Sequence, residues 1–311
     1  INDWGRKCTY VMRPRWDGAL LQSDTGNEPL EIFADANGSL FKPSDIEVGP
    51  DGALWILSWG NDYGVTWNGE PKLENQKNEG RIFRIWHHKN PPYKKTEWLS
   101  EKRLKPISKW SLQELVDDFD HPIPSWRTDA QGELIKRNTS KASNALIRLT
   151  RSARTQAEET WMIWTLAQHE TKDPKQNTKV NQNLIQLSQG NGTLNQKIQS
   201  LRAIRLRLAK TNTNEKSKFS EALSQALNHK NPRIRFAAIQ TIWQARLDSF
   251  TPSIKTLAAN EKDRLTFYAA WGALRDMLPP SELRSMLQDK KSGVRLAALL
   301  ALLDLQLVTP I

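Results

Sequence analysis

Six similar segments recur in the second two thirds of the sequence, and this repetition constrains the fold more than any other feature. Three of the segments contain an alanine pair, which lets neighbouring helices approach closely. The segments align when these positions are taken as equivalent: residues 127, 159, 197, 235, 267 and 295. The steps between them are 32, 38, 38, 32 and 28 residues. A drifting period in the thirties is typical of stacked helix pairs.

Each repeated segment follows a polar turn, and a shorter helical pattern precedes that turn. The shorter patterns are clearest at residues 112–119, 219–227 and 281–287. This order predicts two antiparallel helices in every repeat, with the second helix carrying the alanine pair. We therefore expect an α-solenoid of about six HEAT-like helix pairs over residues 106–311.

The first part of the chain has a different pattern. Short runs of strand-forming residues alternate with Gly, Pro, Asn and Asp; they lie at residues 18–23, 30–34, 45–48, 53–59 and 81–86. Gly49-Pro50-Asp51-Gly52 separates two of these runs, and this tetrapeptide is typical of a tight hairpin turn. We expect antiparallel β structure over residues 1–90, as a sandwich, a small barrel or propeller blades.

A linker is predicted at residues 91–105, where Pro91-Pro92 excludes a helix interior or a central strand. Charge changes at the same place. Residues 1–105 carry equal numbers of basic and acidic side chains, so the net charge of +11 lies in residues 106–311. The sequence thus predicts a multidomain β + α protein.

Some classes of protein are excluded by simple counts. The single Cys8 cannot form an intramolecular disulfide, a CxxC pair or a c-type haem attachment motif. No segment approaches the ~18 uncharged apolar residues of a membrane-spanning helix. Gly-rich phosphate loops, serine nucleophile elbows and HExxH motifs are also missing from the sequence.

Two segments and their order suggest a family. The first reads FKPSDIEVGPDGALW over residues 41–55, the second reads GRIFRI over residues 80–85, and the repeats follow them. This arrangement resembles the large planctomycete-type membrane-bound dehydrogenases. The resemblance implies a six-bladed β-propeller of the soluble sugar dehydrogenase type, then HEAT-like repeats and often a c-type cytochrome domain. Residues 1–90 would be the C-terminal blades of such a propeller.

The resemblance also implies a function and a location. The chain would be the C-terminal part of a periplasmic or cell-envelope sugar or alcohol dehydrogenase. Pyrroloquinoline quinone or haem c would be bound elsewhere in a longer protein, and the partners would be the rest of the propeller and a cytochrome c domain. Two departures limit this expectation: Ser58 stands where the family often has Asp, and the haem attachment motif is absent. In addition, about ninety residues make at most two blades. We expect this chain alone to be inactive as an oxidoreductase.

The loop at residues 60–80 would lie on the face where sugar dehydrogenase propellers bind cofactor and substrate. Asn61, Asp62, Tyr63 and Trp67 make it a candidate substrate-binding loop, because polar and aromatic side chains together suit a sugar ring. The alternative is a solvated insertion with one packed Trp.

No metal site is expected in this chain. Asp45 and Asp51 fit hydrogen-bonding roles at a strand end and in a turn. His87 and His88 follow a strand, where adjacent side chains point to opposite faces and do not readily share one metal ion.

The middle of the repeat region is the most basic part of the sequence. Residues 172–210 contain eight Lys and Arg residues against the single acid Asp173. The candidate residues for binding an acidic protein or polysaccharide are Lys197, Arg202, Arg205, Arg207 and Lys210. Arg233 and Arg235 could join them along a groove of the solenoid. The alternative is structural, since arginine stems often cover the core of helical repeats.

Nucleic acid is a less favoured partner, because acidic residues are interleaved in several repeats and would interrupt a continuous positive stripe. Three function classes stay open on the sequence alone. They are an accessory part of a dehydrogenase-like protein, in which the repeats act as a spacer or docking scaffold, a non-catalytic interaction scaffold, and a polyanion-binding solenoid.

Overall fold

The computed structural model describes residues 1–3, 6–23, 31–35, 41–59, 80–89, 101–153, 155–208, 211 and 213–307, without the side chains of 213–215. The chain divides into two compact units. One unit contains Ile1–Arg15 and Leu21–Ala130, and the other contains Trp16–Leu20 and Gln131–Ile311. The expected linker at residues 91–105 falls within the first unit, and its residues 91–100 lie outside the described part of the chain.

The strands of the described residues form small antiparallel sheets. They are β1 Asn2–Asp3, β2 Cys8–Val11, β3 Pro14–Asp17, β4 Leu20–Ser23, β5 Glu31–Asp35, β6 Pro43–Val48, β7 Leu54–Ser58 and β8 Arg81–Ile85. One sheet has the order β1-β2-β5, a second is the hairpin β3-β4, and a third has the order β6-β7-β8. Each of the five predicted strand runs overlaps one of these strands.

The predicted hairpin turn joins β6 to β7. The N–H of Gly52 donates to the carbonyl of Gly49 and the N–H of Gly49 donates to the carbonyl of Ala53, both at 2.9 Å. Gly52 has φ +77°, a conformation that favours glycine. Ile56 is completely buried at the centre of the sheet, opposite Ile46 on β6 and Phe83 on β8.

The propeller itself remains a prediction from the family resemblance. Blades usually have four strands, and the described strands form sheets of three, two and three. Strands β1 to β3 were not predicted. The residues of β1 and β3 are mostly polar and show no alternation of apolar side chains that would indicate a sheet. Strand β2 consists of strand-forming residues, but its run is only four residues long.

The helices form six successive pairs among the described residues. Their bounds are α2 Leu112–Asp117, α3 Pro124–Arg137, α4 Ser140–Leu149, α5 Gln156–Gln168, α6 Pro174–Gln189, α7 Leu194–Leu208, α8 Thr213–Leu227, α9 Pro232–Gln244, α10 Thr251–Asn260, α11 Arg264–Met277, α12 Pro280–Met286 and α13 Ser292–Asp304. Short 3-10 helices occur at Ile107–Lys109, Asp118–Asp120 and Asp248–Phe250. All six aligned segments lie in the second helix of a pair. The predicted α-solenoid is therefore confirmed.

Local sequence explains where these helices begin. The side chains of Asn231 and Asp263 cap α9 and α11 by accepting hydrogen bonds from backbone N–H groups of the first turn. Proline occupies the first turn of α9 at Pro232, where its missing N–H costs no hydrogen bond. At α2, Ser111 and Glu114 form a reciprocal capping box.

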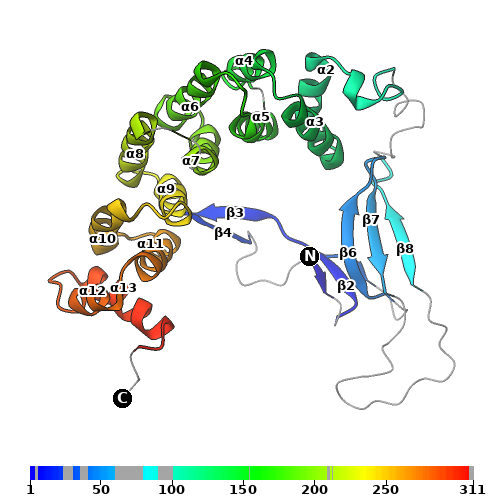
Figure 1. Ribbon diagram of the computed structural model, residues 1–311. Coiled ribbons are helices and arrows are strands. Elements are labelled where there is room, and N and C mark those ends of the chain that lie inside the picture. The colour runs from blue at the N-terminus through cyan, green and yellow to red at the C-terminus, as the bar shows by residue number, and fades with distance from the viewer. Residues whose placement is uncertain are drawn as a thin grey trace. The chain divides into compact units, whose positions relative to one another are not determined.

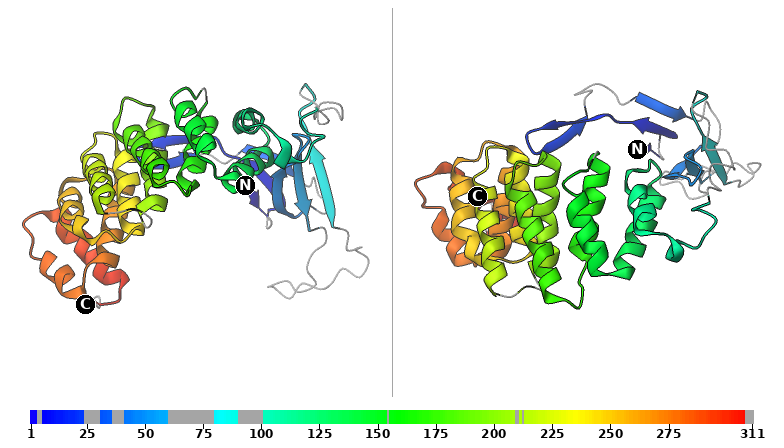
Figure 2. Two further views of the ribbon diagram at one scale, coloured as in Figure 1. Left: turned by 45° about the horizontal axis from the view of Figure 1, so that its top comes forward. Right: turned by 90° about the horizontal axis from the view of Figure 1, so that it is seen from above.

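From α4 to α13 the first helices of the pairs form an outer layer and the second helices form an inner layer (Figure 1). Seen from above, successive pairs stand side by side along the array (Figure 2). The paired alanines of α9, α11 and α13 are buried where neighbouring inner helices meet. Gly272 has the same role on α11, because a Cβ there would lie 2.9 Å from the ring of Trp243 on α9.

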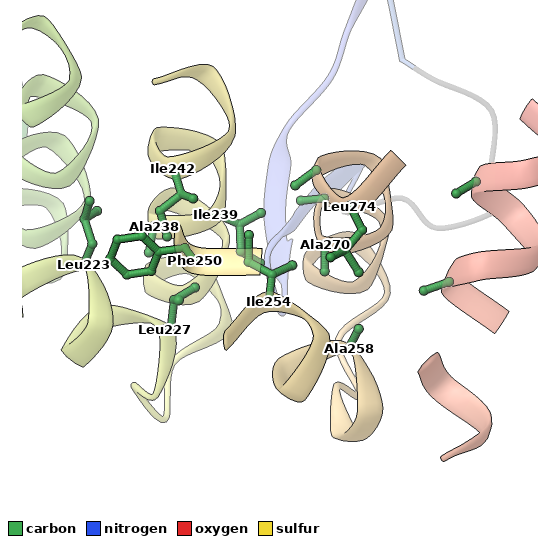
Figure 3. Close-up of a cluster of buried hydrophobic side chains, with 14 of the residues drawn as sticks. Leu223, Leu227, Ala238, Ile239, Ile242, Phe250, Ile254, Ala258, Ala270 and Leu274 are labelled. Carbon is green, nitrogen blue, oxygen red and sulfur yellow. The ribbon is translucent and has the colours of Figure 1, made fainter. Parts of the chain in front are cut away.

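A continuous apolar core runs between the two layers. Figure 3 shows its middle part, where Leu223 and Leu227 of α8 and Ile254 of α10 face Ile239 and Ile242 of α9. These side chains are almost completely excluded from solvent. Each helix pair alone would leave one apolar face exposed, so the stacking of the pairs stabilises the array.

Two of the repeats have an arginine near the start of the inner helix that bonds to the preceding turn. The guanidinium of Arg235 donates to the carbonyls of His229 and Lys230 in its own turn, and to both carboxylate oxygens of Glu261 in the next. Arg295 makes the same two turn contacts, with the carbonyls of Asp289 and Lys290. These arginines are therefore structural, and Arg235 is not available for a groove that binds polyanions.

Candidate functional site

The predicted substrate-binding loop lies outside the described residues, so Asn61, Asp62, Tyr63 and Trp67 remain predictions. The Ser58 side chain on β7 is buried and accepts a hydrogen bond from the N–H of Lys42 at 3.0 Å. Ser58 thus joins the chain before β6 to the end of β7.

Asp51 has the hydrogen-bonding turn role that the sequence suggests. Its buried carboxylate accepts from the N–H of Ala53, the indole N–H of Trp55 and the guanidinium of Arg84. Burial alone would raise the pKa of Asp51, but these donors outweigh burial and hold the pKa below its ordinary value. Asp51 is therefore an ionised anchor of the β6–β7 turn.

The described residues contain no cluster of His, Cys, Asp and Glu suited to a metal ion. The expectation that His87 and His88 point to opposite faces is wrong, because their rings stack on one another with centroids 4.8 Å apart. Among the helices described here, none is long and apolar enough to cross a membrane.

The basic residues predicted on α7 do not form one patch. Arg202 is half-buried, whereas Arg205 is exposed and lines a pocket of about 540 Å³ together with Lys216 of α8 and Gln244 of α9. Lys197 lies near His229, and its charge helps to lower the pKa of that histidine, after the larger effect of burial. Lys210 lies outside the described residues.

Arg207 corrects the sequence-based interpretation of this segment. Its side chain is buried and donates from Nε to the amide oxygen of Asn181 at 2.8 Å and from Nη1 to the carbonyl of His169 at 2.6 Å. The guanidinium thus ties α7 to α6 and to the end of α5. Arg207 belongs to the repeat core and is not exposed to a partner.

Arg202 and Arg233 form a different pair, on the adjacent inner helices α7 and α9. Both side chains are half-buried, and neither guanidinium makes a hydrogen bond or an ion pair within the described part of the chain. Burial lowers the pKa of Arg202. Burial also lowers the pKa of Arg233, and the positive charge of Arg202 adds to that effect. The two cations therefore repel one another, and no anion among the described residues compensates them.

Three other arginines of the array have a counter-charge among the described residues. Arg137, Arg235 and Arg275 all have carboxylate partners, namely Glu133, Glu261 and the pair Asp276 and Asp304. A half-buried charge without a partner loses hydration and regains nothing. The site formed by Arg202 and Arg233 is thus suited to an anion, and we call it the arginine pair.

A residue from the N-terminal part of the chain also contributes to this site. Trp16 lies on β3, just before the turn of the β3–β4 hairpin, and the centroid of its indole ring is 3.5 Å from Cζ of Arg233. Figure 1 shows the end of β3 beside α9. The sequence analysis missed Trp16, and the only local signal for it was a tryptophan next to an Asp-Gly turn.

The side chains around the arginine pair on the inner helices are amides and aromatic rings. Gln199 of α7 accepts a hydrogen bond from the indole N–H of Trp164 at 3.0 Å, and Phe236 and Gln240 of α9 are half-buried. Amides and rings suit a peptide backbone and its side chains. The nearby carboxylate of Asp263 is already engaged, by Thr266 and by the N–H of Ala19.

No family model and no curated protein matches the chain. Several solved structures are weakly similar to it. The Escherichia coli protein YibA is 17% identical over 68% of this chain and 76% of its own, with a TM-score of 0.48. A chain of the complex of CpcE and CpcF of phycocyanin lyase from Nostoc is 18% identical over 61% of this chain and 96% of its own, with a TM-score of 0.33. A designed armadillo repeat protein in complex with a (KR)4 peptide is 16% identical over 62% of this chain and 98% of its own, with a TM-score of 0.33. The solenoid assignment rests on the helix pairs themselves.

Proposed function

We propose that the helical array is a protein-docking scaffold that holds an acidic partner on the inner helices of its middle repeats. The observation that carries this proposal is the arginine pair. Arg202 and Arg233 are half-buried cations on adjacent helices, and neither has an anionic partner among the described residues. A carboxylate supplied from outside would remove their mutual repulsion and compensate their lost hydration.

Charge distribution favours an acidic protein segment over nucleic acid. Nucleic-acid binding requires several positive groups that follow a phosphate backbone. Asp276 on α11 and Asp304 on α13 lie beside Arg275, and Glu261, at the end of α10, is paired with Arg235. These carboxylates would repel a continuous polyphosphate, whereas a short acidic peptide needs only a local pair of cations.

The dehydrogenase parent, with pyrroloquinoline quinone or haem c and an envelope location, remains a prediction from the family resemblance. The scaffold function does not depend on it.

The proposal is tested by measuring the affinity of the full chain for a fluorescein-labelled deca-glutamate peptide by anisotropy at ~20 mM and ~150 mM salt. We expect Arg202→Gln to weaken binding about tenfold, which corresponds to ~1.4 kcal/mol. Arg205→Gln is the matched control, because it removes the same charge from the same helix at an exposed position away from Arg233. It should change the affinity less than twofold.

Two outcomes would contradict the proposal. If the wild-type chain does not bind the peptide at low salt, the array has no acidic-partner site of this kind. If Arg202→Gln and Arg205→Gln weaken binding equally, only net charge matters and the arginine pair is not a site.

A further inference from the structure

The turn of the β3–β4 hairpin is seated against the inner helices, although it lies 244 residues from its main contact. The N–H of Ala19 donates to Oδ2 of Asp263 at 2.9 Å, and Asp263 also caps α11 with its other oxygen. Ala19 is only 3% exposed. One carboxylate therefore holds both the start of a repeat helix and the hairpin turn.

The contact is close enough to require glycine at its centre. Gly18 has φ +56°, and a Cβ at this position would lie 1.8 Å from Oδ2 of Asp263. The neighbouring ring of Pro232 forms another wall of this seat, with its Cγ 3.8 Å from the same Cβ position. We call residues 16–20 the hairpin tip.

The hairpin tip places Trp16 over Arg233. A ring 3.5 Å from Cζ contacts the face of the guanidinium, and this arrangement leaves the N–H groups at the edge of the guanidinium plane available to an acceptor. Half of the Trp16 side chain is exposed, so the contact is not explained by burial of the ring in a core. Restricting Arg233 to one orientation lowers the entropic cost of binding an anion.

We propose that Trp16 is a positioning residue of a carboxylate clamp, in which Arg233 and Arg202 bind neighbouring carboxylates of an acidic peptide segment. This inference rests on the scaffold function proposed above and specifies its site. Trp16 acts through Arg233 by holding the guanidinium with its N–H edge directed to the ligand. The N-terminal hairpin thereby contributes a residue to the binding site of the repeat array.

The clamp couples ligand binding to docking of the hairpin tip. A ligand that binds Arg233 in its stacked orientation favours the docked tip, and by linkage the docked tip favours the ligand to the same extent. The amide hydrogen of Ala19 reports docking directly, because its acceptor is Asp263. We expect saturating deca-glutamate to slow exchange of this amide at least threefold, while amides in the core of α9 are unchanged.

The closing experiment is a double-mutant cycle on the full chain with deca-glutamate as the probe. We expect Trp16→Leu to raise Kd about fivefold and Arg233→Gln to raise it about tenfold. The double variant should bind no more weakly than Arg233→Gln alone, because Trp16 acts only through Arg233. Trp16→Phe keeps an aromatic face and should stay within twofold of wild type. Far-UV circular dichroism and the melting temperature verify that each variant is folded.

The outcomes separate this inference from the scaffold function. If Arg202→Gln weakens binding but Trp16→Leu and Arg233→Gln do not, the scaffold function stands and the clamp is wrong. If the Trp16 and Arg233 effects add fully, Trp16 contacts the ligand itself and is not a positioning residue. If a 20-nucleotide single-stranded DNA binds more tightly than the peptide and depends on Trp16, the assignment to carboxylates is overturned. Unchanged exchange of the Ala19 amide in the presence of bound peptide would refute the coupling.

Discussion

The helical array and the β-strands bury their apolar side chains in different ways. On α9, Ile239 and Ile242 are completely excluded from solvent by α8, α10 and α11. On β7, Ile56 is buried, while its neighbours Trp55 and Leu57 are exposed on the other face of the sheet. Ile82 on β8 is 66% exposed.

The difference shows how each kind of structure obtains a core. In the array, every helix pair finds the next pair a few tens of residues along the chain, so burial repeats with the sequence. A three-stranded sheet buries one face only where a second layer covers it, and the described strands leave apolar side chains on the other face. Substitutions should therefore have large effects in the array and small ones on the outer face of the sheet.

The largest expected effect is in the core of the array. Ile239→Ala should lower the free energy of unfolding by about 2–5 kcal/mol, because it removes buried methyl groups and leaves a cavity. Ile82→Ala should change it by less than about 0.5 kcal/mol. Urea unfolding followed by circular dichroism compares the two variants. An equally large effect at Ile82 would mean that this face of the sheet is covered in solution.

The second effect distinguishes two arginines of the same helix. Arg207→Gln should destabilise the array by about 2 kcal/mol, because it removes a charged donor from the buried acceptors of Asn181 and His169. Arg205→Gln should be nearly neutral, since its side chain is exposed. Thermal unfolding of the two variants tests this, and equal melting temperatures would show that Arg207 is not a structural residue.

A smaller effect depends on pH and belongs to the sheet. The folded-state pKa of Asp51 lies below the unfolded value of about 3.9, so its stabilising contribution is present above that pH and is lost as pH falls through the folded value. Asp51→Asn should cost about 1 kcal/mol at pH 7 and remove this acid dependence. The pH dependence of the local stability is measured by hydrogen exchange of the Ala53 amide between pH 3 and pH 6. If the variant keeps the same acid dependence, another carboxylate is responsible.

The smallest effect on global stability is expected at the hairpin tip. Gly18→Ala places a Cβ against Asp263 and should undock the tip, with a change of about 1 kcal/mol or less in the free energy of unfolding of the array. The sensitive measurements are exchange of the Ala19 amide, which should become faster, and the emission of Trp16. Unchanged exchange would show that the tip tolerates a side chain at this position.

Much of the fold could be predicted because its signals are local. The alanine pairs and polar turns predict the helix pairs, since helix periodicity and capping depend on residues a few positions apart. The Gly49–Gly52 turn and its flanking strands followed from turn chemistry in the same way. Strands β1 and β3 were not predicted, because their mostly polar residues lack such a local signal.

The candidate site was predicted only in part. Arg202 and Arg233 were among the basic residues considered, but Arg205, Arg207 and Arg235 have the same residue type and similar neighbours. Their different roles depend on what covers each side chain: Arg207 lies in the core, Arg235 faces Glu261, and Arg205 is exposed. Residue type and helical spacing do not report which face of a solenoid is covered.

The sequence by itself determined the helical repeats, the place of the alanine pairs on the second helix of a pair and the β6–β7 turn, because short-range backbone and side-chain preferences decide these features. Only the tertiary structure decided that Trp16 lies on Arg233 and that the Ala19 amide bonds Asp263. Such contacts join segments more than two hundred residues apart, and no local preference encodes them.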